Sequence, residues 1–171
     1  MARYFFTFML ILFAALSRLL PHPANFTPIT AIALFGGVYL DKKHTFIVPV
    51  AAMLISDYFI GFYSGWMWVY ASFAAIGFIG LWLRNHKGIL PIAGASFAGS
   101  VLFFVVTNFG VWISSQVTYS HDIAGLVACY TAAIPFFRNT LAGDLVYVGA
   151  LFGIYELARK YMPHLRLDRA S

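Results

Sequence analysis

The chain has 171 residues, of which 61% are hydrophobic, 19% aromatic and only 10% charged. A soluble domain carries about 25% charged residues, so this composition excludes an ordinary cytosolic enzyme, a disordered chain and a nucleic-acid-binding protein, despite the net charge of +5. The sequence instead predicts an integral membrane protein with one domain over residues 1–171, and its single cysteine excludes a disulfide framework.

A transmembrane helix needs about 20 apolar residues. In chain order, the apolar segments cover residues 4–20, 28–40, 46–62, 66–83 and 90–112. A further apolar stretch, 123–137, leads into a last segment over 136–158. Segment 28–40 is short for a membrane span, so we expect it to tilt little, to extend beyond these residues, or to lie partly inside the protein.

Segment 123–137 poses a choice between six and seven spans. It is short for a crossing, and Pro135 interrupts it near its end. With six spans, nine of the 11 Lys and Arg residues lie on the side of the termini, which obeys the positive-inside rule. Only Arg18 and Arg138 lie outside. We therefore expect an all-α protein with six transmembrane helices and cytoplasmic termini, in which 123–137 is an outer re-entrant or interfacial piece.

The first segment has an alternative interpretation as a cleaved signal peptide, because Arg3 precedes its apolar run. The lack of a clean A-x-A site and the position of Arg18 just after the run argue against cleavage.

Polar residues concentrate in the outer half of this six-helix arrangement. A charged side chain at mid-depth costs at least ~2.5–3.5 kcal/mol, so each needs a reason. Asp57 lies near the outer end of the third span, and Asp144 lies in the last span on one face with Thr140 and Tyr147. The one-sided placement favours a binding site for a compound that arrives from outside. The competing interpretation is structural, with Asp57 paired to Arg18 or Arg138.

Several kinds of chemistry have no motif in the chain. It lacks the G-x-x-x-x-G-K-[ST] phosphate loop, so it cannot hydrolyse ATP by that route. It also lacks H-E-x-x-H and G-x-S-x-G motifs and any histidine pair with ligand spacing. We expect no cofactor and no metal site, and any active transport must use a partner protein or an ion gradient.

Four segments resemble a known family of small bacterial membrane proteins: 20–28 (LPHPANFTP), 55–61 (ISDYFIG), 107–112 (TNFGVW) and 133–144 (AIPFFRNTLAGD). That family carries a domain of unknown function and a transport label. It is similar to the substrate-binding S components of energy-coupling factor (ECF) vitamin transporters, which have six helices. The resemblance implies an S-component-like fold in the bacterial inner membrane.

Within the S components, the chain is most similar to the solitary cobalamin-binding branch. The resemblance implies binding roles for His22, Asp57 and Arg138, which match a histidine, an aspartate and an arginine of that branch in order and approximate spacing. The branch also has a cysteine that ligates cobalt shortly after the aspartate. Here that region, 68–73, reads WVYASF and has no cysteine.

The leading hypothesis is therefore a non-enzymatic membrane protein that binds a vitamin-like micronutrient, with a corrinoid as one candidate, for uptake from the outer side. Its expected partners are the lipid bilayer and, as a candidate, an energising ATPase module. The alternative is a membrane-embedded hydrolase or transferase that uses Asp57 and Asp144; a scaffold role also stays open. Asp57 and Arg138 are predicted to form one site. The full set of predicted binding residues is His22, Asn25, Asp57, Tyr58, Trp66, Tyr70, Asn108, Trp112, Arg138, Asn139 and Asp144.

Overall fold

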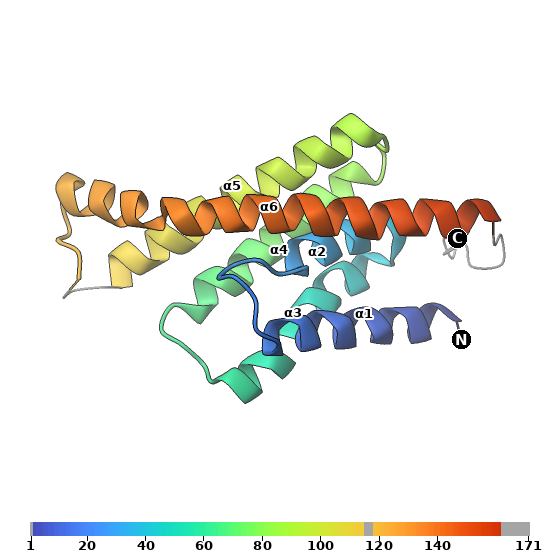
Figure 1. The fold of residues 1–171 in the computed structure, drawn as a ribbon, viewed down its shortest axis with the longest axis horizontal. Helices are drawn as coiled ribbons and strands as arrows, with labels where there is room; N and C mark the ends of the chain where they lie inside the picture. Colours follow the sequence, from blue (N-terminus) through green and yellow to red (C-terminus); the bar gives the residue numbers. More distant parts are fainter. Residues whose placement is uncertain (1, 115–117, 162–171) are drawn as a thin grey trace.

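The computed structural model describes residues 2–114 and 118–161, and these form six α-helices. Figure 1 shows the helices as an elongated bundle in which the start of α1 and the end of α6 lie at the same end. The expectation of an all-α protein with six helices is confirmed. The helices are α1 (Ala2–Leu19), α2 (Ile29–Tyr39), α3 (Lys42–Ile60), α4 (Trp66–Leu83), α5 (Ile89–Ser114) and α6 (Ile123–Tyr161).

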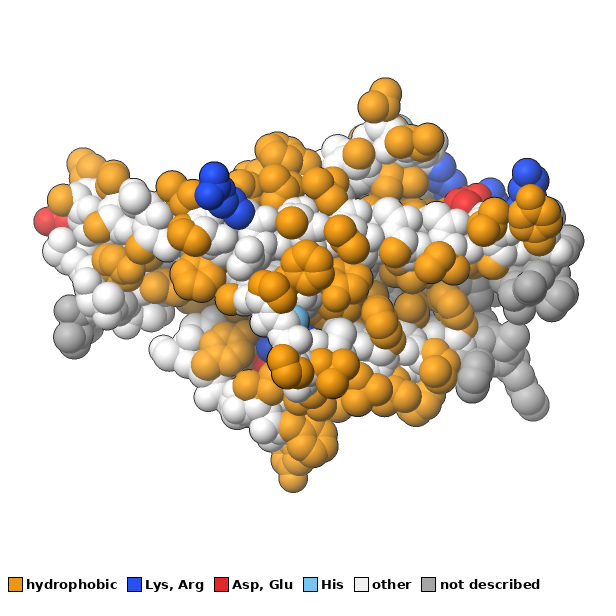
Figure 2. All heavy atoms as spheres, in the orientation of Figure 1, with side chains coloured by type: hydrophobic (Ala, Val, Ile, Leu, Met, Phe, Trp, Pro, Cys, Tyr) orange, Lys and Arg blue, Asp and Glu red, His pale blue; other side chains and the backbone are white. Residues whose placement is uncertain are grey.

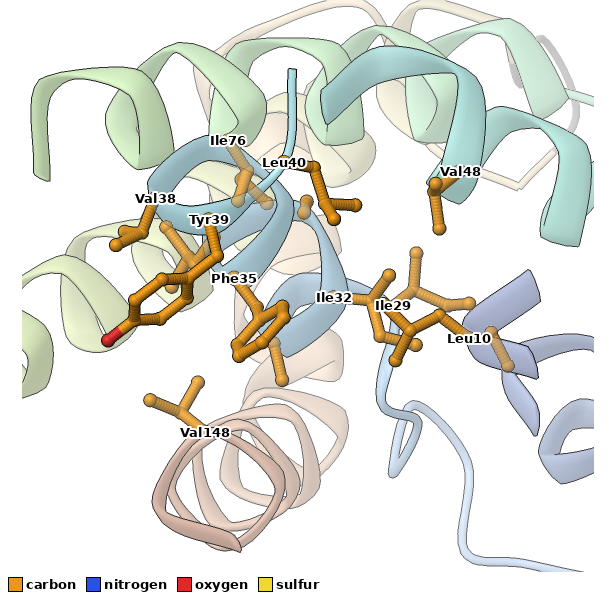
Figure 3. Close-up of a cluster of buried hydrophobic side chains, with 14 of the residues drawn as sticks. Leu10, Ile29, Ile32, Phe35, Val38, Tyr39, Leu40, Val48, Ile76 and Val148 are labelled. Carbon is orange, nitrogen blue, oxygen red and sulfur yellow. The ribbon is translucent and has the colours of Figure 1, made fainter. Parts of the chain in front are cut away.

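The short helix α2 is the centre of the bundle. All 11 of its residues are buried, and it contacts each of the other five helices. Figure 3 shows Phe35 of α2 close to Val148 of α6, and Ile29 close to Leu10 of α1. A helix of this length rises only about 16 Å, roughly half the hydrocarbon thickness of a bilayer. The structure thus confirms that this short apolar segment lies inside the protein.

The buried end of α2 needs partners for its last carbonyl groups, because water cannot reach them. Arg84, which follows α4, donates from Nε to the Gly37 carbonyl at 2.8 Å and from Nη2 to the Leu40 carbonyl at 2.6 Å. The Thr45 hydroxyl donates to the Gly36 carbonyl at 3.2 Å. These bonds give partners to the carbonyl groups of Gly36, Gly37 and Leu40 at the end of a helix that lies within the bundle.

Helix α6 corrects one sequence-based expectation. It is a single helix of 39 residues with Pro135 inside it, so the expected re-entrant or interfacial piece at 123–137 is wrong. Proline removes the hydrogen bond to the residue four positions earlier. That residue is Thr131, which is exposed, so the lost bond is not buried. At about 58 Å, α6 is much longer than a bilayer is thick, and its first part extends beyond the other helices as an arm with the end of α5 (Figure 1).

The outer surface of the bundle is largely apolar. Helices α3, α4, α5 and α6 are each long and apolar enough to cross a membrane, whereas Phe6–Leu19 of α1 and all of α2 are shorter apolar stretches. Figure 2 shows apolar side chains over most of the visible face, with basic side chains both near the end of α6 and in the opposite half of the molecule. Exposed apolar surface on this scale marks a membrane protein. Examples of large exposed side chains are Phe8, Phe59, Phe78, Ile89 and Ile154.

Candidate functional site

Two cavities adjoin each other in the half of the bundle away from the chain termini. The smaller, about 230 Å³, is here called the polar cavity, and its polar lining includes Arg18, His22, Thr30, Tyr63, Thr140 and Asp144. The larger, about 330 Å³, is called the aromatic cavity, and its lining includes Phe103, Phe104, Asn108, Cys129, Phe136 and Phe137. Both cavities are lined by Asn25, Val69, Phe103 and Thr140, so they share a wall.

Helix periodicity explains why Asp57 points inward. The buried residues of α3 recur at three- and four-residue intervals, and Asp57 continues that stripe one turn beyond Met53. Its side chain is completely buried. Arg18, in the last turn of α1, lies with Nη1 2.7 Å from Oδ1 of Asp57. The hydroxyl of Tyr70 on α4 donates to Oδ2 at 2.8 Å. One carboxylate thus holds together three helices.

Arg18 is fixed by several acceptors on α3. In addition to Asp57, its guanidinium donates to the Ser56 hydroxyl and to the Met53 carbonyl. The predicted pair of Asp57 with Arg138 does not form in this structure, and the alternative pair with Arg18 does. Arg138 is exposed and lines neither cavity. Two residues along a helix correspond to about 200°, so Arg138 lies on the opposite face of α6 from Thr140.

The second buried carboxylate, Asp144, lies on the inward stripe of α6 that includes Thr140 and Val148. Only 2% of the residue is exposed. The Ser100 hydroxyl of α5 donates to Oδ2 of Asp144 at 2.6 Å, and Thr30 of α2 provides a second side-chain hydrogen bond. Among residues 2–114 and 118–161, no Lys, Arg or His forms an ion pair with this carboxylate. The prediction that Thr140 and Asp144 share one face is confirmed.

The loop between α1 and α2 brings two predicted residues to the cavities. His22 lines the polar cavity, and Asn25 lines both. Asn25 adopts a left-handed backbone conformation (φ 64°), which asparagine tolerates better than most residues because its side chain can hydrogen-bond locally. The turn that follows is closed by a hydrogen bond from the Phe26 amide to the Pro23 carbonyl at 3.0 Å.

The other predicted residues divide between the aromatic cavity and the surface. Asn108 lines the aromatic cavity and donates to the Phe104 carbonyl at 2.7 Å. Trp112 donates to the Ser120 carbonyl at 2.9 Å and so joins the end of α5 to the loop before α6. The predicted residues that line neither cavity are Asp57, Tyr58, Trp66, Tyr70, Trp112, Arg138 and Asn139.

The sequence analysis did not predict Thr30, Tyr63 and Phe103, which line the polar cavity, as binding residues. It also did not predict Ser100, which donates to Asp144. Tyr63 lies in the loop between α3 and α4, where burial and then the neighbouring Asp57 carboxylate raise the pKa of its phenol, so it stays a hydrogen-bond donor at neutral pH. Ser96 and Ser100, four residues apart on α5, were the available signal, because two hydroxyls on one face of an apolar helix point to an inward polar contact.

The possible metal ligands of the described chain are scattered. Residues 2–114 and 118–161 contain no group of three His, Cys, Asp or Glu side chains that could hold a metal ion. Cys129 is buried against the aromatic cavity, with its sulfur 3.5 Å from the Asn108 carbonyl oxygen.

Comparison with known proteins identifies a family but no individual relative. The chain has no match among curated proteins or among solved structures. Residues 1–165 match a family described as "Family of unknown function (DUF6580)". This match covers nearly the whole chain, including the segments that form both cavities. The chain therefore belongs to the DUF6580 family.

Proposed function

We propose that the protein binds a small, vitamin-like molecule from the outer side of the bacterial inner membrane and serves in its uptake. The observation that carries this proposal is the pair of adjoining cavities at one end of an apolar bundle. Ligand sites are typically concave, largely apolar and equipped with a few placed polar groups. The cavities have this character, with Asp144, Thr140 and Asn25 set among aromatic side chains.

The orientation follows from charge. Among the described residues, Lys42, Lys43, Arg84, Lys87, Arg159 and Lys160 lie in or next to the α2–α3 loop, the α4–α5 loop and the end of α6. The positive-inside rule assigns these segments to the cytoplasm. All six helices then belong to the membrane domain, both termini are cytoplasmic, and the cavities open toward the outside, as the resemblance to S components implies.

The sizes of the cavities bear on the ligand. Sites for small molecules usually measure about 300–1,000 Å³, and the cavities measure about 230 and 330 Å³. A ligand smaller than a corrinoid fits these spaces as they stand. A corrinoid would require the two to merge and widen around their shared wall of Asn25, Val69, Phe103 and Thr140.

The chain has no phosphate-binding loop, so uptake against a gradient needs a source of energy elsewhere. An energising ATPase module is the partner that the S-component resemblance implies. The alternative of a hydrolase or transferase has less support, because both oxygens of Asp57 are engaged, by Arg18 and by Tyr70. A general acid or base must be free to reach its substrate.

Native mass spectrometry of the protein purified in mild detergent from cells grown in rich medium tests this proposal. We expect a single small polar compound to co-purify with the protein and to dissociate on collisional activation. A lipid-linked compound in its place would favour the enzyme, and the absence of any bound small molecule would contradict the binding role.

A further inference from the structure

The charges around the polar cavity do not balance. Arg18 and Asp57 compensate each other at 2.7 Å. Asp144 is almost fully buried and is contacted by the hydroxyl of Ser100 and by Thr30, both neutral. With both carboxylates ionised, the formal charge of these three groups is −1. An uncompensated carboxylate in a membrane interior is costly, and such residues typically mark ligand, ion or proton sites.

Arg18 cannot act as the counter-charge of Asp144. Arg18 lies in the same cavity as Asp144, but its guanidinium is held by Asp57, Ser56 and Met53 on α3. Transfer of Arg18 to Asp144 would leave Asp57 as the uncompensated charge, with the same cost. Apart from His22, which lines the same cavity, a positive group for ionised Asp144 must therefore come from outside the described chain, as a proton or as a cation.

We propose that the polar cavity binds a small organic cation, whose ammonium group pairs with Asp144. This inference rests on the proposed binding function and names the class of its ligand. Thr140, one turn before Asp144 on α6, also lines the cavity and offers a hydroxyl oxygen to the same ammonium group. The cation replaces the missing counter-charge, so its binding energy comes from a buried, charge-assisted hydrogen bond.

Aromatic side chains complete the site for such a ligand. Phe73 of α4 and Phe103 of α5 both line the polar cavity, and their ring centroids lie 5.2 Å apart. An aromatic face attracts a cation through its quadrupole and also covers apolar ligand atoms. A volume of about 230 Å³ limits the ligand, or the part of it that enters, to a small molecule.

Two probes that differ in charge but little in shape test the inference: 2-phenylethylamine, which is protonated at pH 7, and 2-phenylethanol, which is neutral. Binding to the full-length protein in detergent is measured by thermal shift and calorimetry. We expect the wild type to bind the amine about 10- to 100-fold more tightly than the alcohol, as a buried hydrogen bond to a charged group predicts. Asp144→Asn should reduce this ratio to about one.

Glu156→Gln is the matched control, because it makes the same carboxylate-to-amide change on the same helix, about 18 Å further along. It should keep the preference of the wild type. The comparison of amine with alcohol in the wild type stands even where Asp144→Asn does not fold.

The two proposals fail in different ways. Equal binding of amine and alcohol by the wild type, no binding of either, or an unchanged preference in Asp144→Asn would overturn the cation site. A neutral or anionic compound in the native mass spectrum of the wild type would also overturn it while upholding the binding function. The absence of any co-purifying small molecule, or a lipid-linked compound in its place, counts against the function itself.

Discussion

The Arg18 guanidinium and the Asp57 carboxylate lose their water together when the bundle forms. Isolated, either charge would be expensive to bury, but the contact of 2.7 Å and the hydrogen bond from Tyr70 compensate the carboxylate. The sequence indicated that Asp57 requires an ion-pair partner, and Arg18 and Arg138 were the two candidates on the side predicted to be outer. Helix periodicity excludes Arg138, because Thr140 and Asp144 fix the inward face of α6 and Arg138 lies on the opposite face.

Removal of one partner from this ion pair should be far more damaging than removal of both. Arg18→Met and Asp57→Asn should each destabilise the protein by about 3–5 kcal/mol, because each leaves a buried group without its partner. The double variant should lose less than the sum of the two. Equilibrium unfolding in mixed micelles measures these values.

Arg138→Met is the matched control for Arg18→Met, because both remove an arginine from the half of the bundle away from the end of α6. Arg138 is exposed, so its loss should change stability by less than about 0.5 kcal/mol. Equal costs for the two arginines, or strictly additive losses in the double variant, would contradict the pairing of Arg18 with Asp57.

Asp122 precedes the first turn of α6 and acts as its N-cap. Its Oδ1 accepts hydrogen bonds from the Gly125 amide and the Ser120 hydroxyl, both at 2.7 Å. These two bonds, the amide first, lower the pKa of this exposed carboxyl. Because the pKa is lower in the folded state than the unfolded value of about 3.9, the cap stabilises α6 above that pH, and its contribution is lost as the pH falls below it.

The cap can be measured directly by NMR. We expect the Asp122 carboxyl to titrate below its ordinary value, and Asp122→Ala to speed hydrogen exchange of the Gly125 amide at neutral pH. Thr131→Ala, an exposed change further along α6, should leave that exchange rate as it is. A carboxyl that titrates at its unperturbed value would show that the cap does not form.

At the scale of the elements, hydrophobic length and charge were enough to locate all six helices. The segment predicted at 66–83 coincides with α4 (Trp66–Leu83), because Gly65 and Arg84 bound an uninterrupted apolar run. Pro135 was misleading, since proline is costly in a helix only where the freed carbonyl is buried or the ring clashes. The packing of α2 against α4 was also beyond the sequence, because small residues show that close approach is possible but not which helices meet.

Gly37 of α2 and Gly80 of α4 make that close approach. A Cβ atom on Gly37 would lie 2.2 Å from the Gly80 carbonyl carbon, and one on Gly80 would lie 2.9 Å from the Ala33 carbonyl oxygen. These contacts are with backbone atoms, so a methyl group must push the helices apart. Gly37→Ala should therefore destabilise the protein by at least about 1–3 kcal/mol, as overpacking does.

Gly149→Ala is the control for this change. A Cβ atom on Gly149 of α6 would meet nothing within 4 Å, and alanine favours helix over glycine by roughly 1 kcal/mol in aqueous hosts. Thermal unfolding in detergent should show a lower melting temperature for Gly37→Ala and an equal or higher one for Gly149→Ala. Similar stabilities in the two variants would mean that α2 and α4 do not approach so closely.

For the whole molecule, the charge pattern and the fold both indicate that one end is basic and that the other half holds the cavities. The described basic loops and the end of α6 lie at one end, and the cavities lie in the other half of the bundle. Composition predicted the membrane and the outer polar cluster. The cavities themselves were not predictable from one sequence, because they depend on how side chains from all six helices and three loops fill the space between them.

Cysteine labelling tests the orientation. Cys129 is buried, and replacement by alanine gives a cysteine-free background. In intact cells with a permeable outer membrane, an impermeant maleimide should label His121→Cys, in the loop before α6, but not Lys87→Cys, in the loop before α5. Labelling of Lys87→Cys without disruption of the inner membrane would reverse the proposed orientation.

The central claim, that the outer cavities hold a small molecule, is tested most directly by blocking them. Val69 of α4 lines both cavities, whereas Ala71, two residues further along the same helix, is exposed and lines neither. Native mass spectrometry of the wild type, Val69→Trp and Ala71→Trp then compares the bound small molecule in each. We predict that Val69→Trp loses the compound, while Ala71→Trp retains it at the level of the wild type. Retention of the compound by Val69→Trp, or its equal loss from both variants, would contradict the claim.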